Sequence, residues 1–168
     1  MGEGAAVANA LTICRMALSV LQLVPPALSP AFLSLYALAG ATDMLDGYVA
    51  RRTGTEGELG ARLDSIADYV LCAVCLVKIL PAISVPAWLW LWIAAIVLVK
   101  VANVASGYLL ERRLVMPHTT ANKVAGLVVF LVPFALPYCG VVAAAVPACV
   151  VATFAAVQEG CLIRSGKR

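Results

Sequence analysis

The stretch that decides the fold is residues 43–68, which read DMLDGYVARRTGTEGELGARLDSIAD. It holds two pairs of aspartates, Asp43 with Asp46 and Asp64 with Asp68, whose members are three and four residues apart. Side chains at these spacings share one face of a helix. The loop of residues 52–59 is long enough to let the two helices pack antiparallel, so we expect all four carboxylates to converge.

The composition around this stretch is that of an integral membrane protein. The chain has 168 residues, of which 63% are hydrophobic and only 12% charged, with a mean hydropathy of +0.98. A soluble domain carries about 25% charged residues. The net charge of +3 is small and predicts no nucleic-acid partner. We therefore predict one compact transmembrane domain over residues 1–168.

Six apolar segments are long enough to cross a bilayer as helices, which takes about 20 residues each. Prolines or charged residues separate them. The segments cover residues 8–28, 31–51, 60–80, 87–110, 120–136 and 140–163. The predicted fold class is therefore all-α, an integral membrane bundle of six transmembrane helices. The first segment follows no basic region and carries Asn9 and Arg15, so we interpret it as a retained helix and not as a secretory signal.

The basic residues fall on alternate turns of this arrangement. The turns at 25–30, 81–86 and 137–140 contain no lysine or arginine, whereas the opposite ends contain Arg51, Arg52, Arg62, Arg112, Arg113, Lys123, Arg164, Lys167 and Arg168. Basic residues mark the cytoplasmic side. The pattern predicts a multi-pass protein of the cell membrane with both termini, and the four aspartates, on the cytoplasmic side.

The clustered carboxylates need positive charge beside them. One carboxylate in a membrane helix costs about 2.5–3.5 kcal/mol on insertion scales. Oxygen-only ligands select hard cations such as Mg²⁺ or Mn²⁺, and two such ions would balance four carboxylates. A two-metal site suits phosphoryl-type displacement, and Arg51 could bind a phosphate beside it. Cys72 and Cys75 form a C-x-x-C with no second pair, so we interpret them as packing residues.

The spacing D-x2-D-G-x2-A-R-x8-G-x3-D-x3-D resembles the signature of the CDP-alcohol phosphotransferase family, and each of its fixed positions is filled. Asn9, Thr12 and Arg15 also resemble the N-x-x-T-x-x-R element that members carry in their first helix. The resemblance extends over nearly the whole chain, because six helices are expected for the family as well.

The resemblance implies a metal-dependent phosphatidyltransferase of phospholipid biosynthesis. It implies transfer from CDP-diacylglycerol to an alcohol with release of CMP, two Mg²⁺ or Mn²⁺ ions, and a homodimer. By similarity, Asp43, Asp46, Asp64 and Asp68 hold the metals, and Asp68 is also the catalytic base. The CDP pocket would comprise Asn9, Thr12, Gly47, Ala50, Arg51 and Gly60.

The acceptor alcohol is less well defined by the sequence. A phosphorylated acceptor needs cationic partners, for which the candidates are Lys100, Arg112, Arg113 and Lys123, with His118 and Arg164 nearby. Residues 119–126 loosely resemble the start of the fifth helix in phosphatidylglycerophosphate synthases, which favours glycerol 3-phosphate. Inositol phosphate, serine and other alcohols remain alternatives. Lys100 lies midway along its segment, where it is a site residue, pairs with a carboxylate or reaches a lipid head group. Glu159 could pair with Lys100 or Arg164, or face water.

Two other classes of protein are compatible with acids in a membrane. A carboxylate-based ion or proton transporter would spread its acids over the membrane depth and often repeat its halves, whereas these aspartates bunch at one level. A structural membrane protein without chemistry would leave the four aspartates without a purpose. The transferase therefore accounts best for the pattern.

Overall fold

The computed structural model describes residues 3–53, 58–111 and 120–165. Within these ranges the chain is all-α, as predicted, with no strand. The elements are α1 (Glu3–Leu21), α2 (Pro30–Thr53), α3 (Glu58–Ile79), the short 3-10 helix η1 (Leu80–Ala82), α4 (Ala87–Glu111) and α5 (Thr120–Ser165). They form two compact units, Met1–Ile83 and Ser84–Arg168.

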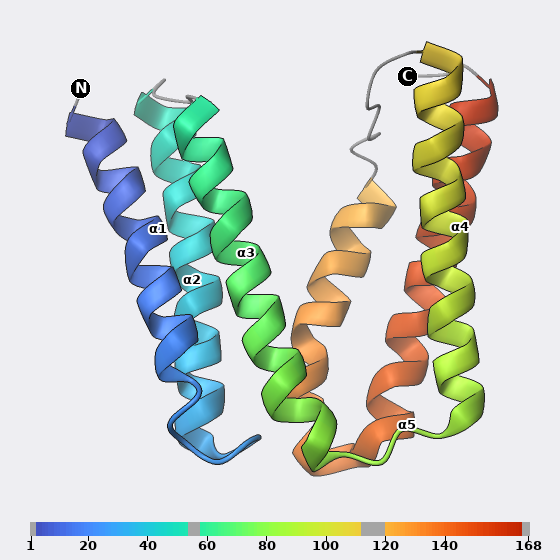
Figure 1. The fold of residues 1–168 in the computed structure, drawn as a ribbon, viewed down its shortest axis with the longest axis horizontal. Coiled ribbons are helices and arrows are strands. Elements are labelled where there is room, and N and C mark those ends of the chain that lie inside the picture. Colours follow the sequence, from blue (N-terminus) through green and yellow to red (C-terminus); the bar gives the residue numbers. More distant parts are fainter. Residues whose placement is uncertain (1–2, 54–57, 112–119, 166–168) are drawn as a thin grey trace. The chain divides into compact units, whose positions relative to one another are not determined.

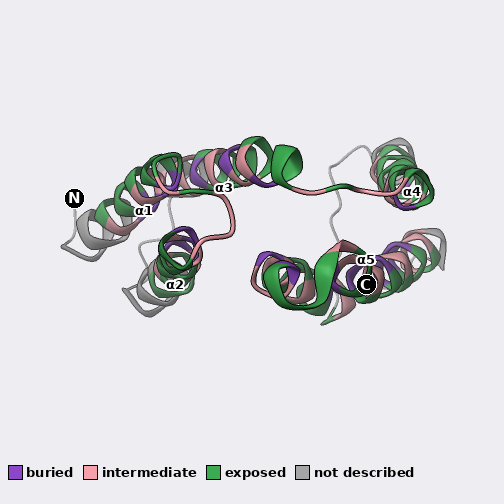
Figure 2. Ribbon diagram, turned by 90° about the horizontal axis from the view of Figure 1, so that it is seen from below, coloured by how far each residue is buried: buried purple, intermediate pink, exposed green. Residues whose placement is uncertain are grey.

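In the first unit, α1 packs against both α2 and α3 (Figure 1). The side chains that α1 and the residue after it bury are polar: Thr12, Arg15, Ser19 and Gln22 are each at most 5% exposed. Large apolar side chains of the same helix, such as Val20, are at least half exposed, and exposed positions run along α1 and α3 in Figure 2. A polar inside and an apolar outside suit a helix whose outer face meets lipid.

The first helix ends earlier than predicted, at Leu21 and not at residue 28. Backbone N–H groups of Leu23 and Val24 donate to carbonyls three residues back, at 3.0 and 3.1 Å, which closes the helix with a tight turn. Pro25 then follows, and the residue before a proline disfavours the helical conformation. The next helix begins where Ser29 accepts a 3.2 Å hydrogen bond from the Phe32 N–H, a side-chain cap on its first turn.

In the second unit, α4 packs against α5, and α5 is divided by Gly140, where φ is 75° and ψ is 173°. Figure 1 shows α5 reversing direction there. The sequence predicted an end at residue 136, before Pro137, but helical backbone continues past this proline. A proline removes one N–H yet keeps a helical φ, whereas the reversal requires a positive φ, which glycine adopts readily. With this break, the described residues contain six α-helical segments besides η1, and that all six cross a membrane stays a prediction.

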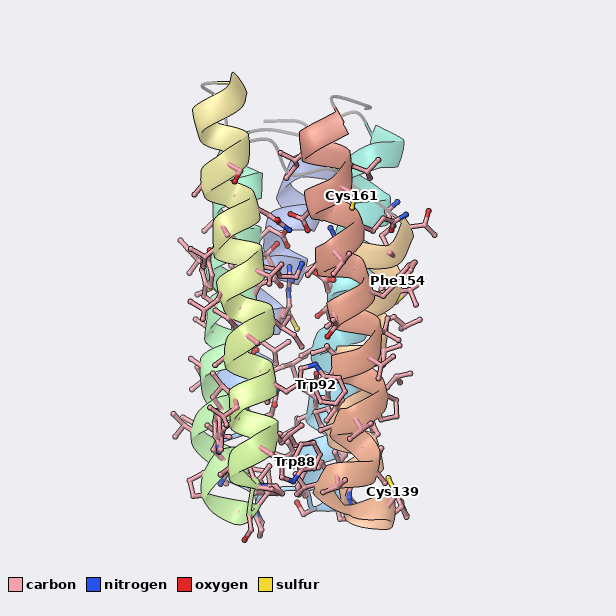
Figure 3. The ribbon with its side chains drawn as sticks, turned by 90° about the vertical axis from the view of Figure 1, so that its right-hand side faces the viewer. Trp88, Trp92, Cys139, Phe154 and Cys161 are labelled. Atoms are coloured by element: carbon pink, nitrogen blue, oxygen red, sulfur yellow. The ribbon has the colours of Figure 1, made fainter. Side chains whose placement is uncertain are left out.

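Polar contacts tie α4 to the second half of α5. The Trp92 indole N–H donates to Thr153 Oγ1 at 3.0 Å, and Figure 3 shows this tryptophan beside α5. The buried Asn103 side chain donates to the Ala156 carbonyl at 2.7 Å. A Cβ at Gly160 would lie 2.7 Å from Asn103 Oδ1, so the glycine makes this close approach of the two helices possible.

Replacing Gly160 with alanine is therefore expected to destabilise the second unit by about 1–3 kcal/mol, the usual cost of forcing extra volume into a packed contact. The matched control is Gly126→Ala, because a Cβ there meets nothing within 4 Å. Alanine at this open helical position is expected to leave stability unchanged or raise it by up to about 1 kcal/mol. Thermal unfolding of both variants in detergent measures the difference, and equal midpoints would contradict the packing assigned to Gly160.

Two stretches of the described residues could cross a membrane by length and composition, Ala87–Ser106 and Thr120–Ile163, and Ala10–Leu21 is a shorter apolar helix. The second stretch has 44 residues and contains the reversal at Gly140, so it is long enough for two crossings. Only 11% and 17% of the two stretches is buried within the protein, unlike the core helix of a soluble domain.

Candidate metal centre

Three of the four predicted metal ligands come together in the first unit. Asp43 on α2 and Asp64 and Asp68 on α3 each present one carboxylate oxygen, and these three atoms lie within 4.8 Å of one another. Their side chains are 49%, 46% and 58% exposed, so the cluster is open to a ligand. We call these three residues the aspartate cluster. Asp46 lies in α2 three residues from Asp43, but its side chain is outside the described part.

A fully buried arginine of α1 contacts every member of the aspartate cluster. Arg15 Nη1 donates to Asp43 Oδ1 and, at 2.6 Å, to Asp68 Oδ1. Its Nη2 donates to Asp64 Oδ1 at 2.5 Å. The guanidinium is 0% exposed, and it joins residues that are 28, 49 and 53 positions away in the sequence. Arg15 therefore ties the three helices together at the level of the carboxylates.

This contact adds to the sequence interpretation, in which two divalent cations supply the neutralising charge. The chain supplies part of that charge itself. The signal was present in the sequence, since an arginine inside an apolar helix needs a carboxylate or another polar partner. What helix periodicity could not give was the face of α1 that meets α2 and α3.

The sequence around Arg15 builds a polar face that holds it in place. Thr12, Ser19 and Gln22 are spaced three, four and seven residues from it and are buried on the same side of α1. Ser19 Oγ donates to the Arg15 carbonyl oxygen at 2.7 Å. At the far end of this face, Cys75 Sγ lies 3.9 Å from Gln22 Oε1 and donates to it.

The aspartate cluster fits a divalent cation in charge and in spacing. Arg15 offsets one of its three negative charges, which leaves an excess equal to the charge of one such ion. Oxygens bound to one Mg²⁺ at about 2.0–2.1 Å lie no more than about 4.2 Å apart, so small side-chain rotations would bring these oxygens into range. Carboxylate oxygens are also the ligands that Mg²⁺ and Mn²⁺ prefer.

The residues predicted for the CDP pocket are only partly visible. Thr12 is buried on α1 one turn from Arg15, and Gly60 lies near the start of α3. The remaining four, Asn9, Gly47, Ala50 and Arg51, lie in α1 and α2, with side chains outside the described part.

Among the predicted acceptor residues, Lys100 on α4 has partners within its own unit. Its Nζ lies 3.4 Å from Glu159 Oε2 and 3.3 Å from Asn122 Oδ1, and Asn122 Nδ2 donates to the same glutamate oxygen at 3.0 Å. The sequence alternative that Lys100 pairs with a carboxylate is confirmed. Lys123 is exposed on α5, while Arg112, Arg113 and His118 lie outside the described residues.

The two partners of this ion pair are not equivalent, because the Glu159 side chain is 7% exposed and that of Lys100 is 42% exposed. Lys100→Met would leave a buried carboxylate short of its counter-charge, whereas Glu159→Gln would leave a cation that reaches the surface. We expect the lysine variant to lose about 1–3 kcal/mol of stability and the glutamate variant clearly less. Thermal unfolding of the two variants tests this, and the reverse order would contradict it.

A family model described as CDP-alcohol phosphatidyltransferase matches residues 5–157. A CDP-diacylglycerol–glycerol-3-phosphate 3-phosphatidyltransferase from Pseudomonas fluorescens is 42% identical over 66 residues, 39% of this chain and 32% of that protein. One of the same name from Cereibacter sphaeroides is 34% identical over 107 residues, 59% of this chain and 48% of that protein. A human CMP-forming cardiolipin synthase is 36% identical over 91 residues, 54% of this chain and 30% of that protein.

The chain thus spans less than half the length of these three relatives. No solved structure matches it. The family match extends through the aspartate cluster, Arg15 and the helices of the second unit up to residue 157. On that match, the chain belongs to the CDP-alcohol phosphatidyltransferase family.

Proposed function

We propose that this protein transfers a phosphatidyl group from CDP-diacylglycerol to an alcohol acceptor and releases CMP. The observation that carries the proposal is the convergence of Asp43, Asp64 and Asp68 in a chain of this family. Three carboxylates on two apolar helices have a clear use if they hold cations beside a diphosphate. The same chemistry gives a reason for their exposure, because a substrate must reach them.

In this proposal, Asp43, Asp46, Asp64 and Asp68 hold two Mg²⁺ or Mn²⁺ ions. When bound, such ions stabilise negative charge on the diphosphate and on the departing CMP oxygen. Asn9, Thr12, Gly47, Ala50, Arg51 and Gly60 surround the CDP moiety. Small residues there let the nucleotide approach the helix backbone.

Asp68 has the further role of general base toward the acceptor hydroxyl. Its side chain is 58% exposed, more than those of the other two members of the aspartate cluster. Its carboxylate can therefore meet an incoming alcohol and accept the hydroxyl proton.

Glycerol 3-phosphate is the acceptor that we propose first, because two of the relatives reported above carry its name. Its phosphate would be bound by cationic side chains, for which Lys100, Arg112, Arg113 and Lys123 are the candidates. Of the two described lysines, Lys123 is the stronger candidate. It is exposed, whereas Glu159 already offsets the charge of Lys100. Inositol phosphate and serine are the alternatives to test.

The proposal includes a membrane arrangement. Six spans with both termini in the cytoplasm would place the aspartate cluster at the cytoplasmic rim of the cell membrane. There the acyl chains of the donor can stay in the bilayer while its head group reacts. We also propose a homodimer, as the family resemblance implies.

The test is an assay of CMP release by purified protein with CDP-diacylglycerol, Mn²⁺ or Mg²⁺, and one alcohol at a time. Glycerol 3-phosphate, inositol phosphate, serine and water alone form the panel. Turnover with glycerol 3-phosphate only is the expected result, and Asp64→Asn is the inactive control. Turnover with serine only would replace the proposed acceptor, and no metal-dependent CMP release with any alcohol would refute the transferase.

A further inference from the structure

The contacts of Arg15 suggest a role beyond packing. Its guanidinium meets one Oδ1 atom of each member of the aspartate cluster, and the three oxygens available to a cation all lie within 4.8 Å of one another. A guanidinium bonded to these three carboxylates offsets negative charge that a divalent cation would also use. Both cations therefore draw on the same three carboxylates.

We propose that Arg15 is a resident counter-ion of the metal centre, which holds the aspartate cluster together without metal and competes with the metal for it. This inference rests on the proposed function in so far as the cluster binds Mg²⁺ or Mn²⁺. Arg15 is then a positioning residue, and it sets how tightly the centre binds its ions.

Two physical arguments indicate that Arg15 competes with the metal for the aspartate cluster and does not only hold the cluster in place. First, like charges a few ångströms apart repel, so a fixed positive charge beside the ligands lowers their affinity for a second cation. Second, the 0% exposure of the Arg15 side chain means that it cannot turn to solvent without leaving its packed site. A metal that binds the cluster therefore shares the three carboxylates with the guanidinium or displaces it.

The same contacts predict a stabilising role in the metal-free protein. Without Arg15, the three carboxylates from α2 and α3 would lose the cation that contacts all of them. Their repulsion would then oppose the packing of the first unit. Binding of a divalent cation would relieve it, so metal should stabilise a variant without the arginine more than it stabilises the natural protein.

The experiment compares the natural protein with Arg15→Gln and Arg15→Lys in detergent. Binding of Mn²⁺ is measured by electron paramagnetic resonance, and thermal unfolding is followed with a chelator and with Mg²⁺. We expect Arg15→Gln to bind Mn²⁺ at least about tenfold more tightly. We also expect Arg15→Gln to unfold at a lower temperature than the natural protein in chelator. Its unfolding temperature should rise more than that of the natural protein when Mg²⁺ is added. Arg15→Lys keeps the charge, so its Mn²⁺ affinity should stay within about threefold of the natural value.

The outcomes separate this inference from the proposed function. If the natural protein binds Mn²⁺ and Asp64→Asn does not, the metal centre stands. Unchanged or weaker Mn²⁺ binding by Arg15→Gln would then overturn the proposal that Arg15 competes with the metal. If the natural protein binds no Mn²⁺, the metal centre itself is refuted.

A second measurement covers the case in which Arg15→Gln does not fold. Side-chain ¹⁵N signals of Arg15, assigned by their loss in Arg15→Lys, are recorded in the natural protein. They should shift when Mg²⁺ replaces the chelator, and identical signals in both conditions would overturn the inference.

Discussion

Replacing Asp68 with asparagine is expected to lower the rate of CMP release by about 10²–10⁴-fold, the usual contribution of a general base. The amide is nearly the same size as the carboxylate, but it cannot accept the proton of the acceptor hydroxyl. Since the side chain is 58% exposed, the change should cost little packing. Steady-state CMP release with saturating donor and acceptor measures the effect.

The matched control for this variant is Tyr69→Phe, the next residue on α3, which is 75% exposed and keeps its ring after the change. It should retain close to full turnover. Thermal unfolding of both proteins tests whether either has lost its fold. Turnover of Asp68→Asn within a few-fold of the natural protein would remove Asp68 from the role of base and leave it, at most, as a metal ligand.

Removal of divalent cations is expected to have a comparable effect, with turnover falling by more than about 10³-fold. A metal that stabilises transition-state charge is worth several kcal/mol, and each 1.4 kcal/mol corresponds to about tenfold in rate. Turnover in chelator, and after adding back Mg²⁺ or Mn²⁺ in excess, gives the measurement. Chelator already saturated with Mg²⁺ is the control for its other effects.

The Arg15 contacts predict that this loss is reversible. Because the guanidinium bonds to all three described carboxylates, the first unit should remain folded after the cations are removed. Circular dichroism in chelator should then match that of the metal-loaded protein, and activity should return at once with metal. Full turnover in chelator would refute the metal-dependent mechanism, whereas irreversible loss would contradict the stabilising role of Arg15.

Much of the fold could be predicted from the sequence because long apolar helices leave a strong local record. Apolar length, prolines and the positions of basic residues gave six helical segments and an all-α fold. The errors lie at the ends. The first helix stops at Leu21, since the chain turns before Pro25, and the reversal in α5 lies at Gly140, since positive φ is needed there.

Part of the candidate site was also predictable. Spacings of three and four residues place Asp43 with Asp46, and Asp64 with Asp68, on single helix faces whatever the helices pack against. The motif that contains them identified the family, and the family match over residues 5–157 confirms that identification. Which acceptor is used could not be read in this way, because cationic side chains of several segments qualify equally by charge.

The sequence by itself therefore determined the helices, the faces on which the acids lie and the family. Only the tertiary structure decided which cation those acids meet. Arg15 reaches Asp68 across 53 residues, and Lys100 reaches Glu159 across 59. The physical reason is that helical periodicity fixes the direction of a side chain relative to its own axis, whereas an ion pair between helices depends on which faces pack together.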